Sequence, residues 1–118
     1  MTLQDLERYQ IALKISDLAW EIYKTLPKEF KYSTNQQFLD SSDSIGANIS
    51  EGYGRFHYKD SLKFYYNARG SLYEAQFWLN RLQKRNLVSD VLYNELQSLI
   101  DIEKLKLNNF INSIKSKI

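Results

Sequence analysis

Apolar residues recur along the first quarter of the chain at the spacing of one face of an α-helix. Steps of four and three residues separate them, as in an amphipathic helix. The positions are Ile11, Ile15, Leu18, Ile22 and Leu26. Pro27 follows directly, and a proline disfavours the right-handed helical conformation in the residue before it. The pattern therefore predicts a helix that ends at about Leu26.

Two later segments carry stripes of the same kind. One has the alternating spacing of a supercoiled bundle, and its positions are Phe64, Ala68, Ser71, Ala75, Trp78 and Leu82. The other consists of Leu92, Leu96, Leu99, Leu107, Phe110 and Ile114. Between them, Asn86 suits the left-handed position that ends a helix, and Ser89 suits the N-cap of the next. We expect Phe64, Trp78 and Phe110 to be core residues.

The segment between Ser33 and Gly54 has few large apolar residues. They are Phe38, Ile45 and Ile49, and small residues fill most of the remaining positions. The small residues are Ser41, Ser42, Ser44, Gly46, Ala47, Ser50 and Gly52. They let a neighbouring helix approach closely, although each glycine costs about 1 kcal/mol of helix propensity. We expect a helix that depends on its packing partners and is ended by Gly52 and Gly54.

Breaks near Pro27, Gly54 and Asn86 divide the chain into four segments. Each has about 22 to 26 residues, or a length of about 33 to 39 Å as a helix. Equal lengths and short links predict an all-α fold, an antiparallel up-down-up-down four-helix bundle. At 118 residues, the whole chain, 1–118, is expected to form a single domain.

Two of the expected helices carry more apolar surface than one bundle core needs. Outside the stripe, the first has Leu6, Tyr9, Leu13 and Trp20. The third has Leu62, Tyr66, Tyr73 and Phe77, roughly 120° from its stripe. Grouped aromatics usually mark an interaction site, so these eight residues are candidates for an oligomer interface. The alternative is a wide core with ordinary surface aromatics.

Composition excludes most catalytic chemistry. The chain has no Cys and only one His, His57, so it lacks the ligand sets of zinc sites and the thiolate nucleophiles. The inward Glu and Glu-x-x-His sets of dimetal bundles are missing, and Gly52-Tyr53-Gly54 matches no nucleotide-binding motif. We expect no catalytic site, metal or cofactor, and hence a protein that is not an enzyme.

Charge and hydropathy limit the partners. The net charge is only +2, which is low for a duplex-binding domain. No run reaches the roughly 18 apolar residues of a membrane span, and the N-terminus lacks the features of a signal peptide. We therefore expect no membrane partner and a cytoplasmic location.

Two carboxylates fall on apolar faces. Asp43 lies on the side of Phe38, and Glu103 lies between Leu99 and Leu107. A buried unpaired carboxylate costs several kcal/mol, so each must find donors, bind a proton or lie near solvent. The candidate donors are Asn48, Ser44, Arg69 and neighbouring hydroxyl groups. A structural polar network or an exposed edge explains both residues, whereas a catalytic pair would lack a nucleophile or metal to serve.

Basic and aromatic residues alternate at the expected corner between the second and third helices. The candidate nucleic-acid contacts there are Arg55, His57, Tyr58, Lys59 and Lys63. Such a corner can stack unpaired bases while the cations contact phosphates. In an antiparallel bundle Lys115 and Lys117 share this pole, and Arg81, Lys84 and Arg85 lie at the other. Asp5, Glu7 and Asp60 lie near the corner and reduce its charge.

A segment of the second helix resembles the signature of a known family, the small four-helix-bundle proteins of intervening sequences in bacterial 23S rRNA genes. It reads Ser44-Ile45-Gly46-Ala47-Asn48-Ile49-Ser50-Glu51-Gly52. Three further segments are similar to the family pattern, namely Leu6-Glu7-Arg8-Tyr9-Gln10-Ile11-Ala12, Glu21-Ile22-Tyr23-Lys24 and Glu74-Ala75-Gln76-Phe77-Trp78-Leu79. The resemblance spans roughly residues 5–110.

The resemblance implies an up-down-up-down bundle, commonly a ring-shaped pentamer, with no established catalytic activity. The family is also similar to accessory proteins of diversity-generating retroelements, whose pentamers bind nucleic acid and a reverse transcriptase through basic surfaces. Two positions depart from the pattern. Leu39 and Asp40 stand in the turn before the signature, where family members often carry arginine. The acidic Asp40 at such a position reduces the attraction for phosphate. Gly46 stands where many members have proline, so no kink is imposed.

Two residues of the signature suit structural roles. Asn48 is expected to form a hydrogen bond with the backbone of another helix or with Glu103. Glu51 is expected to pair with Arg55 one turn later, and such a pair is worth about 0.2 to 0.5 kcal/mol.

Residues and resemblance together predict a non-enzymatic homo-oligomer, with a pentamer favoured, that serves in assembly or as a scaffold. The alternative is an RNA-binding accessory protein that acts through the corner, with RNA or a nucleoprotein as its partner.

Overall fold

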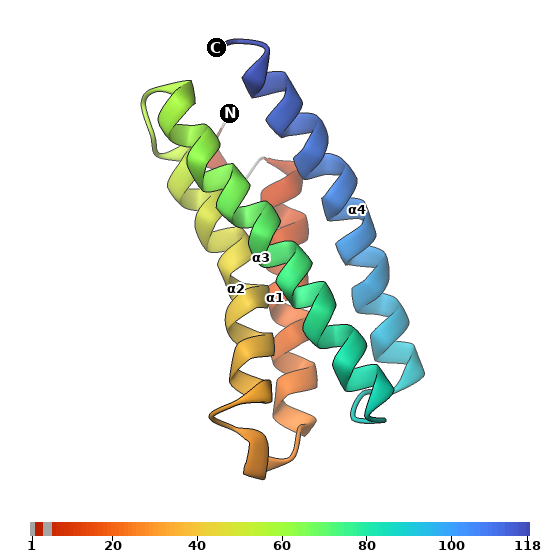
Figure 1. Cartoon of the computed structure of the whole chain (residues 1–118). Coiled ribbons are helices and arrows are strands. Elements are labelled where there is room, and N and C mark those ends of the chain that lie inside the picture. Colours follow the sequence, from red (N-terminus) through yellow and green to blue (C-terminus); the bar gives the residue numbers. More distant parts are fainter. Residues whose placement is uncertain (1, 4–5) are drawn as a thin grey trace.

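The computed structural model of the chain describes residues 2–3 and 6–118 (Figure 1). These residues form four α-helices and a short 3-10 helix, without any strand. The helices are α1 (Glu7–Thr25), η2 (Lys28–Phe30), α2 (Thr34–Tyr53), α3 (Tyr58–Lys84) and α4 (Asp90–Lys115). The predicted all-α fold and the division into four helices are confirmed.

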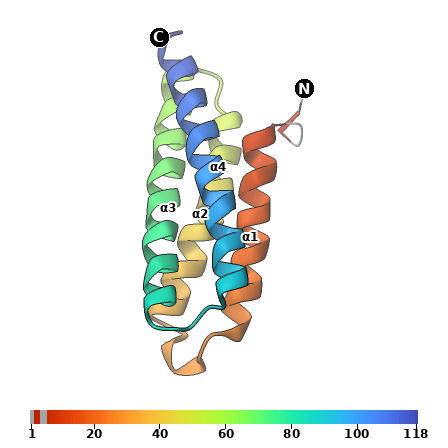
Figure 2. The ribbon, with the colours of Figure 1, turned by 90° about the vertical axis from the view of Figure 1, so that its right-hand side faces the viewer.

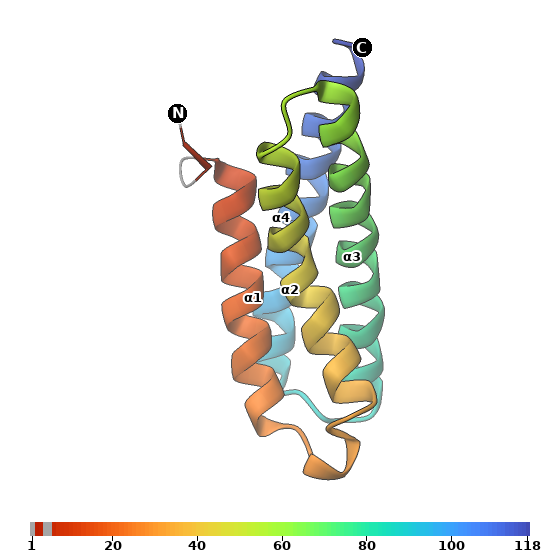
Figure 3. The same ribbon diagram turned by 90° about the vertical axis from the view of Figure 1, so that its left-hand side faces the viewer.

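Consecutive helices run in opposite directions, as the three views show (Figures 1, 2 and 3). α1 packs on α2 and α4, and α3 packs on the same two helices, so the order around the bundle follows the order along the chain. The start of α1, the α2–α3 corner and the end of α4 lie at one pole (Figure 1). The connections from α1 to α2 and from α3 to α4 lie at the other. The structure is therefore the predicted up-down-up-down bundle. Its helices are less equal in length than the sequence predicts, with 19 and 20 residues in α1 and α2 and 27 and 26 in α3 and α4.

The helix ends follow the local signals in the sequence. α1 ends at Thr25, two residues before Pro27. Asn86 has a φ of 58°, the left-handed conformation expected after α3. The Ser89 side chain then caps α4 by accepting a hydrogen bond from the backbone N–H of Leu92 at 3.2 Å. These three predictions are confirmed.

The core confirms the predicted stripe of α1, with Leu18 at its edge and the other four positions buried. In α3 the prediction is partly wrong, because Phe64, Ser71 and Trp78 are only partly buried. The buried stripe of α3 consists of Tyr65, Ala68, Leu72, Ala75, Leu79 and Leu82. The observed stripe keeps the predicted spacing of three and four residues. It differs at every second position, where the buried residue is the one after the predicted residue. In α4, Leu92, Leu99 and Phe110 likewise lie at the edge, while Ile100 and Ile111 are buried.

Small residues of α2 allow the close approach that the sequence predicts. A Cβ added to Gly46 would lie 3.5 Å from the Cβ of Ala12 in α1. A Cβ added to Gly52 would lie 2.8 Å from Cε1 of Tyr65 in α3. Gly54 is the C-cap of α2 and has a φ of −74°, so its conformation is right-handed. The glycine that packing requires is thus Gly52, which lies inside the last turn of α2.

The bundle closes where α1 meets α4. Lys106 Nζ lies 3.1 Å from Glu7 Oε2 and joins these two helices. Nearer the opposite pole, an open hollow of about 600 Å³ lies between them. Leu18 and Leu99 line it together with charged residues of both helices. No helix of the described part of the chain is long and apolar enough to cross a membrane.

Candidate functional site

All five predicted nucleic-acid contacts are exposed at one pole of the bundle. Arg55 follows the end of α2, His57 is the N-cap residue of α3, and Tyr58, Lys59 and Lys63 lie in the first two turns of α3. The chain crosses from α2 to α3 between them (Figure 1). The structure therefore brings these residues to one corner, as the sequence predicts.

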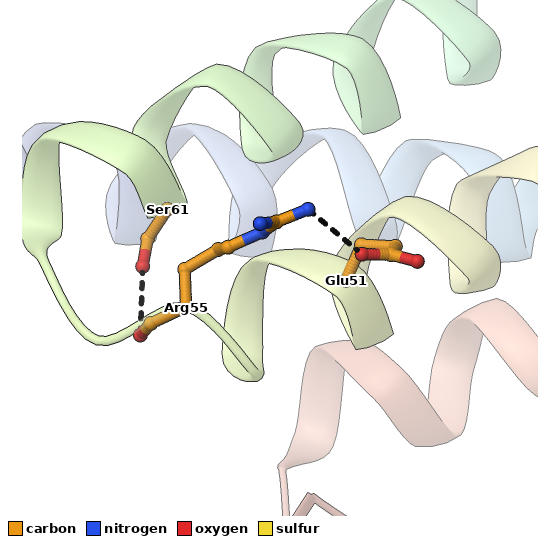
Figure 4. Close-up of polar contacts among 3 residues, drawn as sticks. All are labelled: Glu51, Arg55 and Ser61. Atoms are coloured by element: carbon orange, nitrogen blue, oxygen red, sulfur yellow. Dashed lines mark hydrogen bonds and ion pairs between the residues drawn. The ribbon is translucent and has the colours of Figure 1, made fainter.

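Arg55 is held along the bundle (Figure 4). Its Nη2 lies 3.3 Å from Glu51 Oε2, which confirms the predicted pair one helical turn apart. Its Cζ lies 4.5 Å from the centroid of the Phe64 ring. The Arg55 carbonyl oxygen accepts a hydrogen bond from Ser61 Oγ at 3.5 Å, as drawn in Figure 4. Glu51 thus offsets part of the charge that this corner presents.

The end of α4 adds charge at the same pole. Lys117 Nζ lies 5.3 Å from the centroid of the Tyr58 ring, so Lys117 meets the corner as predicted. Arg81, Lys84 and Arg85 are exposed at the end of α3, at the other pole. In the turn before the signature, Asp40 is exposed and accepts a hydrogen bond from Gln36 Nε2 at 2.7 Å.

A pocket of about 210 Å³ lies beneath the corner, and we call it the corner pocket. Its lining residues are Arg8, Gly52, Tyr53, Arg55, Phe56, Tyr58, Ser61, Tyr65, Phe110, Ile114 and Lys117. Arg8 comes from α1, and its Cζ lies 3.2 Å from the centroid of the Phe110 ring. Sequence analysis missed Arg8 as a site residue. Its position three residues before Ile11 places Arg8 on the buried stripe of α1, and this spacing could have indicated that Arg8 faces the bundle.

Tyr66, Tyr73 and Phe77 are exposed along α3, while Leu62 on the same face is partly buried against the core. We call Leu62, Tyr66, Tyr73 and Phe77 the α3 face, and Phe77 is 53% exposed. At its centre, Gly70 has no atom within 4 Å of the place where a Cβ would stand. Neither packing nor a special backbone conformation within the described residues calls for a glycine there.

A second apolar surface lies on α1, where Trp20 is exposed, Leu13 is partly buried and Tyr9 is partly buried against the core. We call Tyr9, Leu13 and Trp20 the α1 face; Trp20 is 48% exposed and stacks on Tyr23 with centroids 5.5 Å apart. Leu6 was predicted to join it, but only 8% of Leu6 is exposed. That prediction is wrong, because Leu6 precedes α1 and packs into the bundle.

The two faces border different neighbouring helices. In α1, Ser16 lies one turn before Trp20 and donates a hydrogen bond to Asp43 of α2 at 2.6 Å. In α3, the Tyr73 ring lies 5.2 Å from Lys104 Nζ of α4. The α1 face therefore lies on the α1–α2 side of the bundle and the α3 face on the α3–α4 side. In the order around the bundle, these are opposite sides.

The two displaced carboxylates have different environments. Asp43 is exposed at the edge of α2 and accepts its bond from Ser16. Glu103 is 0% exposed, and neither of its oxygens has a hydrogen-bond partner within the described residues. Burial raises the pKa of Glu103 to about 8; the charge of Arg8 opposes this shift and that of Glu7 adds to it. No hydrogen bond joins the two carboxylates, because Asp43 bonds Ser16 and neither oxygen of Glu103 has a partner among the described residues.

The predicted donors for Glu103 bond elsewhere. Asn48 Nδ2 donates to the Ser44 carbonyl oxygen of its own helix at 2.9 Å. Arg69 Nη1 donates to Asn108 Oδ1 at 3.1 Å. The expected bridge from Asn48 to another helix or to Glu103 is therefore wrong. Within residues 2–3 and 6–118, no three His, Cys, Asp or Glu side chains gather as metal ligands would.

Fold and surface together define a small up-and-down four-helix bundle with a basic and aromatic corner. The chain belongs to the 23S rRNA-intervening sequence protein family, whose model matches residues 4–109. A solved structure of similar fold is a protein of unknown function from the S23 ribosomal protein family of Bacteroides thetaiotaomicron. Its TM-score is 0.81, with 24% identity over 88% of this chain and 97% of that one. No curated protein matches the chain.

Proposed function

We propose that the protein is a non-enzymatic scaffold of the cytoplasm, a homo-oligomer whose subunits meet through the α1 and α3 faces. The observation that carries this proposal is Gly70 at the centre of the exposed α3 aromatics. A glycine inside a helix costs about 0.5 to 1 kcal/mol relative to alanine. The described residues of the subunit gain nothing in return, whereas a neighbouring subunit can approach the bare backbone between Tyr66 and Tyr73.

The placement of the faces supports a ring. Because the two faces differ and lie on opposite sides, contact between them is head-to-tail, and such contacts form a closed ring when the rotation between subunits closes. A twofold dimer would instead need one face that complements itself. The family resemblance favours five subunits. The lack of Cys and the single exposed His57 support a role without catalysis.

A solution mass tests the assembly. We expect a mass of about five times the 14.0 kDa of one chain at tens of micromolar protein. Tyr73→Glu puts a charge on the α3 face and is expected to yield monomers. Tyr32→Glu is the matched control, because Tyr32 is 89% exposed, lies in the α1–α2 connection and belongs to neither face. A monomeric wild type, or equal loss of mass in both variants, would contradict the proposal.

The corner favours a second function, contact with RNA. Five exposed basic and aromatic residues share this pole with Lys117. Binding through phosphates would weaken steeply with salt, with a log–log slope near −0.7 per phosphate neutralised on a single strand. We expect Lys59→Gln with Lys63→Gln to reduce that slope. Absence of binding to structured RNA at about 50 mM salt would remove this candidate.

A further inference from the structure

The corner pocket gathers cations from three separate parts of the chain. Arg8 comes from α1, Arg55 from the α2–α3 corner and Lys117 from the end of α4. No carboxylate is among the described residues that line the pocket. Among the lining cations, Arg55 forms an ion pair, with Glu51 outside the lining. The charge of the lining is therefore positive.

Arg8 is the cation whose environment most needs an anion. Its Nε is buried and has no hydrogen-bond partner in the described part of the chain. Burial lowers the pKa of Arg8, while the Tyr65 hydroxyl and Glu103 oppose that shift. Glu103 gives little charge in return near neutral pH, because burial raises its own pKa to about 8. A half-buried guanidinium without an ionised partner attracts an anion that can reach it.

Aromatic rings make up much of the remaining wall, together with Gly52, Ser61 and Ile114. Phe110 lies under the Arg8 guanidinium, and Tyr58 lies beside Lys117. Phe56, at the mouth of the pocket, is 96% exposed and meets the His57 ring edge-on, with centroids 5.2 Å apart. Exposed rings beside cations suit a flat ring that carries a negative group, because bases stack on aromatic side chains while arginine holds phosphate.

We propose that the corner pocket binds the phosphate of a nucleotide, with the base stacked outside on Phe56 or Tyr58. The volume of about 210 Å³ fits this division, since pockets that enclose a whole drug-sized ligand start at roughly 300 Å³. Arg8 and Lys117 hold the phosphate oxygens, and Arg55 closes the pocket on the α2 side. The inference deepens the second candidate function and rests on it for the source of the nucleotide. A free nucleotide and a single-stranded RNA share this chemistry.

Calorimetry at about 50 mM salt tests the pocket with three small probes and one RNA. The small probes are adenosine 5′-monophosphate, adenosine and inorganic phosphate, and the RNA is an adenosine octamer. We expect the monophosphate to bind at least about tenfold more tightly than adenosine or phosphate alone, because charge-assisted bonds and stacking act together. Equal binding of the monophosphate and adenosine would overturn the proposal.

Matched arginine variants separate the pocket from general charge. Arg8→Gln is expected to weaken monophosphate binding about tenfold. Arg69→Gln is the control, because Arg69 also lies over a ring, 5.0 Å from the Tyr66 centroid, but outside the pocket. Lys117→Gln, near the exposed C-terminus, gives the same test if Arg8→Gln fails to fold. Equal losses in the pocket variants and in Arg69→Gln would overturn the assignment.

The RNA arm distinguishes the sources. If the octamer binds and loses affinity in Arg8→Gln or Lys117→Gln, the pocket holds a nucleotide of RNA. If the monophosphate binds and the octamer does not, the pocket stands and serves a free nucleotide, while the RNA candidate fails. If the octamer binds equally to wild type and both pocket variants, the corner contacts RNA without the pocket, and the pocket proposal fails alone.

Discussion

Gly52 in α2 and Tyr65 in α3 fit together so closely that no side chain can stand between them. A Cβ at Gly52 would lie 2.8 Å from Cε1 and 2.9 Å from Cζ of the buried tyrosine ring, and 3.2 Å from the Ser61 carbonyl oxygen. Neither the Tyr65 ring, which is packed in the core, nor the Ser61 backbone oxygen can move far to make room for a methyl group. The contact fixes how near the end of α2 approaches α3, and with it the wall of the corner pocket.

We therefore expect Gly52→Ala to destabilise the fold. The gain in helix propensity of up to about 1 kcal/mol is smaller than the cost of overpacking, about 1 to 3 kcal/mol. Urea unfolding of both proteins measures the difference in the free energy of unfolding. A more stable variant would show that Tyr65 can move aside freely.

Gly70→Ala should have the opposite effect on an isolated subunit. Open space surrounds the new methyl group, so the free energy of unfolding at low protein concentration should rise by about 0.5 to 1 kcal/mol. In the proposed ring the methyl group meets a neighbour, and the assembly should dissociate at higher protein concentration than wild type. Urea unfolding at high dilution measures the stability of the subunit. The solution mass as a function of protein concentration measures the strength of the assembly. An assembly of unchanged strength would contradict the role given to Gly70.

Glu103 should make stability depend on pH. Because the folded-state pKa of about 8 lies above the ordinary 4.5, the folded protein holds a proton that the unfolded chain has released. The contribution of this residue to stability is complete below pH 4.5 and decreases by about 1.4 kcal/mol per pH unit until about pH 8. Arg8 and Glu7 are the charged groups that act on it.

Glu103→Gln should flatten that decrease, since a neutral amide releases no proton. Thermal unfolding between pH 5 and 8.5 measures the change. Glu95→Gln is the control on the same helix, because Glu95 is exposed. If wild type and Glu103→Gln show the same pH dependence, the carboxylate is not held neutral in the fold.

Ser89→Ala should remove the cap of α4. The lost hydrogen bond to the backbone N–H of Leu92 is worth about 1 kcal/mol, with a range of about 0.5 to 2 kcal/mol. Ser33→Ala is the control, because the Ser33 side chain makes no capping bond to α2. Urea unfolding should separate the two variants by that amount, and equal effects would contradict the capping role.

The fold could be predicted largely from the sequence because its signals are local. Pro27, Asn86 and Ser89 act within one or two residues of the helix ends that they set. The hydrophobic periodicity predicts which residues of a helix are buried less precisely than these local signals predict where a helix ends. α3 has apolar residues on both sides of its stripe, so Phe64 and Tyr65 fit the pattern about equally well. Packing against α2 decides between them, since Tyr65 faces the gap left by Gly52.

The candidate site could be predicted only in part. The corner residues are neighbours along the chain, so their grouping is visible in the sequence. The corner pocket joins Arg8 to Phe110 and Lys117, which only the folded bundle brings together. The place of Glu103 on the α4 stripe indicated an apolar face but left its burial open, and the fold shows it to be buried. The exposure of Asp43 was open as well, because it depends on how far α1 covers the edge of α2.

Closure of the bundle between α1 and α4 has a consequence for how the chain folds. The other three helix contacts join neighbours linked by short connections, which form quickly because little chain entropy is lost. Contacts such as Glu7 with Lys106 join distant parts of the sequence and form only when the rest is in place. An open hollow interrupts this seam. We therefore expect the contacts between α1 and α4 to form last during folding. The backbone amides at this seam should be the first to exchange with solvent hydrogen.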